Sequence, residues 1–378
     1  MTIRMLRQRK LHDPISARTW ESICDGSQVH VQSGRPGNQK CDIKHLESDE
    51  DARKWAEKQE WTRLKKGFVL VNAQAQSGEP SLLCYLGRAC TGAMTIIGTG
   101  DLIHCNQYVE GGKGDELIFI DANARICARH DLSNMGLVWE IQTTSRHGEE
   151  VLRMDAGIFT WTIGNSTLTL ISERTDRAPG FVSVAGNLAA WHARGFLEVR
   201  DVASDQTLLR QPLTASVHGG HTPQMVGALS PDGRRLAVCS VPGEIQYLDV
   251  FSGKVLARHQ GDFEMITKMH WTADGRWIIA LENYGRWRLM CFDAASGEPR
   301  PDWMLQEDMS RSDFAISSDG SQLAVTHRGH MAIYDLSTME RRCHFRLDHV
   351  VRSACVAWTA SDVVSVRTDY GCVGTYMV

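Results

Sequence analysis

The sequence predicts a mainly β protein in which similar four-stranded sheets repeat along the chain. Residues 226–347 give nearly the same pattern three times: an apolar strand, an Asp-Gly turn, a β-branched strand, a loop and a third strand that ends in Asp. The three terminal aspartates, Asp249, Asp293 and Asp335, are 44 and 42 residues apart. We expect a short turn and a fourth short strand after each of them.

A repeat of this length indicates a closed ring of sheets. Self-similarity at about 40 to 45 residues, with four short strands per unit, is typical of a β-propeller of the WD40 type. One twisted four-stranded sheet cannot cover both of its faces, whereas radial stacking buries each face against a neighbour. The Asp-Gly turns suit tight hairpins and need no catalytic role. They are Asp232-Gly233, Asp274-Gly275 and Asp319-Gly320.

The pattern extends on both sides of these three units. Upstream, two further strands end at Asp121 and Asp201, which are 80 residues apart, and residues 157–172 fill the unit between them. Downstream, residues 354–378 give only three strands. Residues 82–86 are predicted to supply the missing fourth strand and so to close the ring.

The propeller is therefore expected to span residues 81–378. At about 42 residues per blade this length gives seven blades, with six or eight as alternatives. Five tryptophans at or near strand positions are expected to pack between blades: Trp139, Trp161, Trp191, Trp271 and Trp358. Four residues in or near loops are candidates for a partner-binding face: Trp287, Trp303, Arg286 and Arg288.

Charge is distributed unevenly between the two parts of the chain. Residues 1–72 hold 14 Lys and Arg against 10 Asp and Glu, a net charge of +4, whereas the remaining residues carry a net charge of −8. A basic part joined to an acidic one suggests nucleic-acid contact by the first. The opening segment, residues 1–17, is basic. Its run of charges consists of Arg4, Arg7, Arg9 and Lys10. We expect this run to be disordered or to form a solvated strand. The alternative is an arm that reaches onto phosphate or onto an acidic surface of a partner.

Residues 18–72 predict a separate small α+β domain. Two strands, Thr19–Cys24 and Gln28–Gln32, flank an Asp-Gly turn, and a Gly-rich loop over residues 33–37 leads to a third strand at Cys41–Leu46. A capping box that starts at Ser48 then begins a helix. That helix carries Ala52, Trp55 and Ala56 on one face, runs toward two lysines and has Gly67 as its stop.

This order of strands, G-R-x-G loop and helix ending in K-K-G-F resembles the WGR domain over residues 18–72. The signature Trp-Gly-Arg reads Ser33-Gly34-Arg35 here, so its tryptophan is replaced. In WGR domains of the DNA-damage poly-ADP-ribose polymerases, that loop and nearby basic residues contact DNA ends and strand breaks. The resemblance implies DNA contact by six residues: Arg18, Arg35, Lys40, Lys44, Lys65 and Lys66. In the alternative interpretation, Arg35 anchors its own loop and the lysines are an ordinary solvated face.

The rest of the sequence offers little for catalysis. Two HxxH patterns, His218–His221 and His327–His330, lie outside helices and have no carboxylate or cysteine at ligand spacing. No G-x-S-x-G, G-x-x-x-x-G-K-[ST] or HExxH pattern occurs. We therefore predict no enzyme, catalytic residue, cofactor or metal. The 11 scattered cysteines and the lack of an apolar leader or 18-residue apolar run predict a soluble, cytoplasmic protein.

The favoured interpretation is a non-catalytic adaptor. Its propeller binds a protein partner, its WGR-like domain touches DNA or a nucleoprotein, and residues 73–80 form a short polar linker that permits some relative movement. Divergent proteins of this kind resemble accessory subunits of bacterial conflict and antiviral defence systems. The alternatives are a pure protein-interaction scaffold and a propeller hydrolase with a metal in the central channel.

Overall fold

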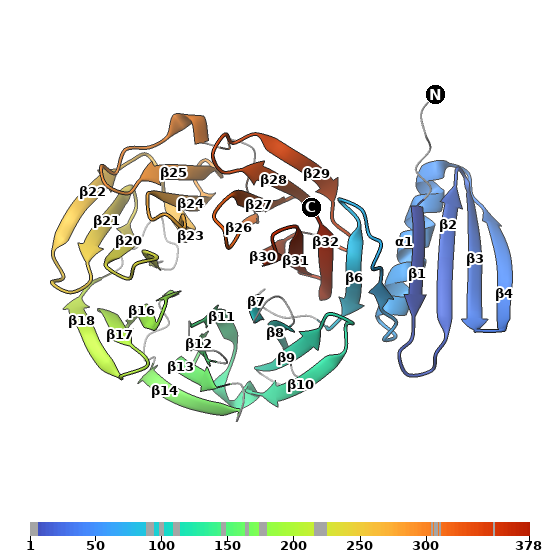
Figure 1. Ribbon diagram of the computed structural model, residues 1–378, viewed down its shortest axis with the longest axis horizontal. Coiled ribbons are helices and arrows are strands. Elements are labelled where there is room, and N and C mark those ends of the chain that lie inside the picture. The colour runs from blue at the N-terminus through green and yellow to red at the C-terminus, as the bar shows by residue number, and fades with distance from the viewer. Residues whose placement is uncertain are drawn as a thin grey trace.

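The computed structural model describes residues 7–87, 94–97, 102–108, 114–144, 149–162, 166–173, 180–214, 225–303, 305, 309, 311–350 and 352–378. A small domain of one sheet and one helix comes first, and a ring of sheets follows (Figure 1). No helix in these residues is both long enough and apolar enough to cross a membrane.

The N-terminal domain, residues 7–72, is an antiparallel sheet in the order β1-β2-β3-β4 with one helix against it. Ala52 and Ala56 of the helix pack on Val29. As predicted, Ser48 caps the helix, since its hydroxyl accepts a hydrogen bond from the Asp51 amide at 3.1 Å. The elements are β1 (Arg7–His12), β2 (Thr19–Asp25), β3 (Gln28–Arg35), β4 (Asn38–His45), α1 (Asp49–Leu64) and β5 (Leu70–Val71).

Two boundaries of this domain differ from the sequence prediction. The opening segment, expected to end before residue 18, contributes strand β1, which pairs with β2 from Arg7 to His12. The predicted loop over residues 33–37 is instead a tight hairpin, because β3 runs to Arg35 and β4 begins at Asn38. Gly34 is required there: its φ is +143°, and an added Cβ would lie 2.5 Å from the Asn38 carbonyl oxygen.

Seven further antiparallel sheets surround a common axis in the described part of the chain, and six of them are made of consecutive strands (Figure 1). The first four are β7 (Met94–Ile97), β8 (Leu102–Tyr108), β9 (Asp115–Asp121) and β10 (Ile126–Asp131); β11 (Val138–Thr143), β12 (Glu149–Met154), β13 (Gly157–Thr162) and β14 (Thr167–Glu173); β15 (Val182–Ala185), β16 (Leu188–Ala193), β17 (Phe196–Asp201) and β18 (Gln206–Pro212); and β19 (Val226–Leu229), β20 (Arg235–Val241), β21 (Glu244–Asp249) and β22 (Val255–Gln260).

The last three sheets complete the ring. They are β23 (Met265–Trp271), β24 (Trp277–Tyr284) and β25 (Leu289–Asp293); β26 (Asp313–Ile316), β27 (Gln322–His327), β28 (His330–Asp335) and β29 (Arg341–Arg346); and β30 (Ala354–Ala360), β31 (Val363–Thr368), β32 (Cys372–Met377) and β6 (Pro80–Tyr85), joined by β5. Short 3-10 turns occur at Ser133–Met135 and Pro301–Trp303.

The predicted turn chemistry is confirmed in these sheets. Strands β9, β17, β21, β25 and β28 all end at a predicted aspartate, and each carboxylate accepts backbone hydrogen bonds from the turn that follows. At Asp249 the distance from the Ser252 amide is 2.7 Å. The glycines of the three Asp-Gly turns have positive φ, at Gly233, Gly275 and Gly320. The carboxylates at the strand ends satisfy amides that the tight turns would otherwise leave unpaired.

Among the residues that the structure describes, the fifth sheet has three strands and not the fourth that the sequence predicts. In the described residues, β25 is followed by isolated bridges from Phe292 to Pro299 and from Leu289 to Leu305. Pro299 and Pro301 carry no backbone N–H, so they cannot donate to a ladder and a regular strand does not form. Trp303 packs into the core at this place instead.

The ring closes as predicted, with a strand from each end of the propeller region. Strand β32 pairs with β6, so that Val373 lies opposite Cys84 and Gly374 opposite Leu83. On its other side β6 pairs with β5, the last strand of the N-terminal domain. The N-terminal domain is therefore joined directly to the closing sheet.

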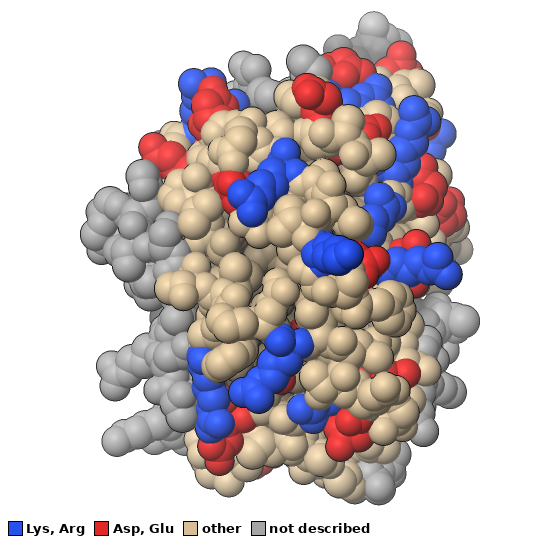
Figure 2. Space-filling model, turned by 90° about the vertical axis from the view of Figure 1, so that its left-hand side faces the viewer, with Lys and Arg blue, Asp and Glu red and all other residues tan. Residues whose placement is uncertain are grey.

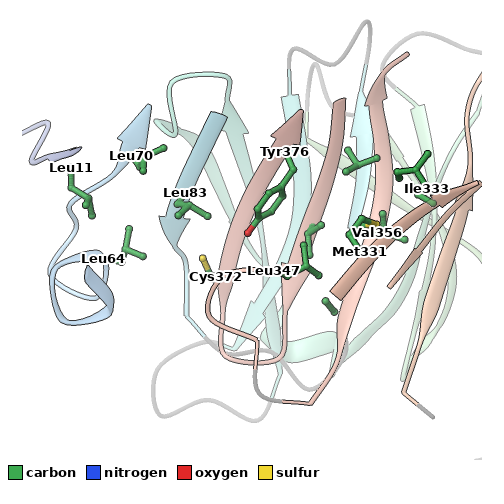
Figure 3. Close-up of a cluster of buried hydrophobic side chains, with 14 of the residues drawn as sticks. Leu11, Leu64, Leu70, Leu83, Met331, Ile333, Leu347, Val356, Cys372 and Tyr376 are labelled. Carbon is green, nitrogen blue, oxygen red and sulfur yellow. The ribbon is translucent and has the colours of Figure 1, made fainter. Parts of the chain in front are cut away.

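A single hydrophobic cluster runs across this connection. Leu11, Leu64 and Leu70 of the N-terminal domain pack with Leu83 and Tyr376 of the closing sheet (Figure 3). The linker is held as well, because its Gly78 amide donates to the Met377 carbonyl oxygen at 2.8 Å. The sequence predicted that residues 73–80 would let the two domains move relative to each other. In the structure, the shared hydrophobic cluster and these backbone hydrogen bonds instead hold the N-terminal domain against the closing sheet.

Charged groups also cross this domain junction, which we define as Arg7, Arg9, Glu60, Asp348 and His349. The Asp348 carboxylate lies 3.1 Å from a guanidinium nitrogen of each arginine. Glu60, with a side chain 1% exposed, lies 2.7 Å from the His349 imidazole. The two predicted N-terminal arginines are therefore partners of buried carboxylates rather than a solvated run. Arg4 lies outside the described residues.

Candidate functional site

The basic residues predicted to contact nucleic acid fall into two groups. Arg18, Arg35 and Lys66 line one open groove of about 860 Å³, between the β3–β4 hairpin and the C-terminal half of α1. The groove also contains Arg63, which the sequence interpretation missed. We call these four residues with their surroundings the basic groove.

The described lining of the basic groove carries positive charge and no acid, and one nearby acid that feels it is Asp13, whose pKa is lowered by a hydrogen bond with Ser16 and also by the charge of Arg18. None of the 13 described residues that line it has a carboxylate. The uncharged lining is largely polar: Thr19, Ser33, Asn38, Gln59 and Thr62, beside Trp20, Gly34, Pro36 and Phe68. Four cations around a polar floor with amide and hydroxyl groups provide the donors that phosphate oxygens accept.

Local structure explains why the four cations meet. The tight hairpin turn places Arg35 at the end of β3, while Thr19 and Arg18 lie beside it at the start of β2. Arg63 lies one helical turn after Gln59 on the same face of α1, and Lys66 follows in the turn that ends the helix. This helical spacing is the signal that could have identified Arg63.

Trp20 belongs to the lining of the basic groove, but its ring is not open to a ligand. It lies directly opposite Ser33 in the β2–β3 register, and its side chain is 1% exposed. The Arg63 guanidinium stacks over its ring at 4.5 Å, and burial lowers the pKa of Arg63 from its ordinary value. Because Arg63 covers this indole, Trp20 offers no open ring on which a base could stack.

The remaining predicted nucleic-acid residues lie outside the groove. Lys40 pairs with Ser33 and Lys44 with Val29 across the β3–β4 ladder, so both share the sheet face on which the groove opens. Both are exposed on the edge strand β4. Lys65 instead lies above the Trp61 ring, at 5.8 Å, on the helix side that faces the propeller.

The four residues predicted to bind a partner are not together on an open surface. Arg288 is 5% exposed and bonds to Glu282 and Asp262, and Trp303 is 4% exposed in a hydrophobic cluster. Burial opposes the charge of Arg288, but the two carboxylates outweigh it and raise its pKa. These two residues are structural, which corrects the prediction. Arg286 is exposed and pairs with Asp262, and Trp287 is half-buried.

Of the two histidine patterns, the one that lies in the described residues has a structural explanation. His327 and His330 pair across the β27–β28 hairpin, and His330 stacks on His344 with centroids 5.0 Å apart. His218–His221 lies outside the described residues. In the part of the chain that the structure describes, no three His, Cys, Asp or Glu side chains gather as a metal site would require.

Most of the predicted inter-blade tryptophans lie where expected. Trp161, Trp191 and Trp271 are buried, and the indole nitrogens of Trp271 and Trp358 donate to backbone carbonyls of the preceding sheet at 2.7 and 3.0 Å. Trp139 differs, since it is 36% exposed and donates to the Asp155 carboxylate at 2.7 Å. It borders the central channel rather than packing between sheets.

The sequence matches no known family model and no curated protein. Solved structures do resemble its fold. The β-propeller domain of Cps50 (Swd1) from Myceliophteria thermophila is 11% identical, with a TM-score of 0.62 over 79% of this chain and 99% of that one. A chain in a crystal structure of the mitotic checkpoint complex is also 11% identical, with a TM-score of 0.64 over 82% of this chain and 94% of that one. These likenesses show that the chain is a mainly β protein with a β-propeller fold.

Proposed function

We propose that this protein is a non-catalytic adaptor, in which a seven-bladed propeller binds a protein partner and a WGR-like N-terminal domain contacts DNA or a nucleoprotein. The observation that carries the nucleic-acid part is the basic groove, where four cations line one surface that has no carboxylate. Cations gathered on an open surface favour a polyanion, because each phosphate contact releases a condensed counterion.

The resemblance to WGR domains supports the same surface. The Gly-Arg of the signature falls at the hairpin that forms one wall of the groove, and the helix that runs into Lys65-Lys66 forms another. With Ser33 in place of the tryptophan and Trp20 covered by Arg63, the groove supplies charge and hydrogen bonds but no stacking ring. Contact is therefore to phosphates, which positions a protein without reading sequence.

Fluorescence anisotropy with the full chain tests this proposal. We expect labelled blunt, nicked and single-stranded DNA to bind at about 50 mM salt and to bind at least tenfold more weakly at about 200 mM. Arg35→Ala should weaken binding to all sequences alike and reduce the salt slope by about 1. Lys66→Ala should do the same, because it removes a second cation from the same groove.

Lys10→Ala is the matched control. Lys10 belongs to the same domain and carries the same charge, but it alternates with Arg9 and Leu11 on β1 and therefore projects from the opposite face of the sheet. It should leave binding unchanged. If no DNA binds at low salt, or if Lys10→Ala and Arg35→Ala have equal effects, the nucleic-acid part is wrong and a pure protein scaffold is the better description.

The adaptor part of the proposal rests on the propeller fold. A cytoplasmic location belongs to the same proposal and is supported by the free thiols of the ten described cysteines. A place in a bacterial defence complex is a further extension that depends on the sequence resemblance alone.

A further inference from the structure

The fourth sheet of the ring carries a concentrated apolar surface on its outer side. Phe251, Val255 and Leu256 are 60%, 42% and 55% exposed. They are three of the nine large hydrophobic side chains that are exposed in the described residues, and they lie within six residues of one another. Single exposed hydrophobic residues are ordinary, whereas a contiguous group marks a contact surface. We define the β22 surface as Phe251, Val255 and Leu256 with Lys254 and Arg258.

The other repeats show that the ring does not need these residues. In the sixth sheet, Arg341 and Arg342 stand where Val255 and Leu256 stand here. In five of the sheets the terminal aspartate accepts a hydrogen bond from an amide of the following turn, so this turn does not require Phe251. Two residues after the terminal aspartate, the other repeats have Asn123, Ala203, Ala295 and Ser337.

The backbone holds this apolar group outward. Val255 pairs with Leu248 and Ala257 pairs with Tyr247, so Leu256 is an extra residue with no partner on β21. Such a β-bulge re-aims side chains and bends the strand. Within the described residues, β22 is the outermost strand of its sheet, so its outer edge presents unpaired backbone groups.

The charges of the β22 surface are positive, although Lys254 lies close enough to Asp249 to help the Ser252 hydrogen bonds lower the pKa of that carboxyl. Lys254 and Arg258 are exposed and make no ion pair with any described residue. The nearby acids are engaged, since Asp249 accepts from Ser252 and Glu244 accepts from Gln260. Figure 2 shows this side of the molecule, where Lys and Arg side chains border a large uncharged area.

We propose that the β22 surface binds an acidic, apolar segment of a partner protein, which adds along β22 as an extended strand. The open strand edge supplies main-chain hydrogen bonds, the apolar residues supply contact area, and the two cations select acidic residues. Two copies of this chain fit poorly there, because Lys254 and Arg258 of each copy would face those of the other. This proposal rests on the proposed function, since it names the surface through which the propeller binds its partner.

A defined peptide tests the β22 surface. The probe is a labelled ten-residue peptide of alternating glutamate and valine, and the charge control is the lysine–valine peptide of the same length. The triple variant Phe251→Ser, Val255→Arg, Leu256→Arg copies the sixth sheet and should therefore fold. We expect anisotropy to show binding of the glutamate–valine peptide that weakens at least tenfold in the triple variant and in Lys254→Glu/Arg258→Glu.

Each contrary result of this test leads to a different conclusion. Absence of binding by the acidic peptide, equal binding of the lysine peptide, or equal binding by the triple variant would each overturn the proposal. A dimer in sedimentation that disappears in the triple variant would mean that a second copy occupies the surface. If wild type and triple variant retain the same partner protein, the β22 surface is refuted while the adaptor function stands. DNA binding by the triple variant reports on the basic groove separately.

Discussion

Arginine is used in opposite ways at the basic groove and at the domain junction. In the groove, Arg35 is exposed and no carboxylate lines the surface around it. At the junction, Arg7 and Arg9 are 19% and 13% exposed and lie within ion-pair distance of Glu60 and Asp348. Both sets belong to one basic domain, yet one is available to a ligand and the other stabilises the assembly of two parts. Net charge alone therefore does not identify a binding surface.

The largest effect is expected where a buried charge loses its partner. Asp348→Ala leaves Arg7 and Arg9 without their closest carboxylate, and removal of one member of a buried pair typically lowers the free energy of unfolding by about 3 to 5 kcal/mol. Urea unfolding measures this loss. Asp302→Ala is the control, because Asp302 is 64% exposed and pairs with Arg300 at the surface. Its effect should stay below about 1 kcal/mol; equal effects would remove the distinction between the two regions.

The second effect is a pH dependence confined to the junction. Burial alone would raise the pKa of Asp348, but Arg9 and Arg7 outweigh it and hold that pKa below its ordinary value. The carboxylate therefore stabilises the fold above its unfolded pKa of about 4, and this contribution is lost as pH falls through the folded value. Wild type should be more stable than Asp348→Asn at pH 7, and the difference should shrink below about pH 4. A difference that does not vary with pH would contradict this account.

A smaller effect is expected from a single hydroxyl at the junction. The Asp348 amide donates to the Tyr376 hydroxyl at 3.0 Å, and Tyr376 is 1% exposed. Tyr376→Phe removes this acceptor and leaves the amide unpaired, which should lower the free energy of unfolding by about 1 to 2 kcal/mol. DNA binding by this variant should match wild type, because the basic groove lies on other residues.

The smallest effect on stability is expected in the groove itself. Arg35→Ala removes an exposed side chain that forms no ion pair with a described residue, so the free energy of unfolding should change by less than about 0.5 kcal/mol. The same variant should bind DNA more weakly than wild type. A large loss of stability would instead identify Arg35 as an anchor of its own hairpin, which is the alternative that the sequence leaves open.

Local chemistry explains which features the sequence could predict. The turns after Asp249 and Asp335 and the helix cap at Ser48 depend on residues two to five positions apart, and the structure confirms them. Ring closure was predictable because the last repeat lacks a strand and residues 82–86 have strand character.

The features that the sequence missed depend on distant residues. Arg9 and Asp348 are 339 residues apart, and nothing near either one indicates that they meet. Trp303 and Arg288 have the composition of a contact surface, but tertiary packing buries them where two prolines replace a fourth strand. In the basic groove, the sequence could predict Arg35 of the hairpin. It could not predict Arg63, because that prediction depends on how the helix packs on the sheet.

The closing pair of strands also sets the order of events during synthesis. Ser81 of β6 and Thr375 of β32, whose hydroxyls are 2.6 Å apart in the ring, are separated by 294 residues. At about 5 to 20 residues per second, a ribosome makes the second strand roughly 15 to 60 s after the first. Until then the nascent N-terminal domain has no closed ring on which to bury Leu64 and Leu70. Attachment of this domain is therefore a late step of translation, and through that interval the nascent chain exposes an unpaired strand edge to which chaperones can bind.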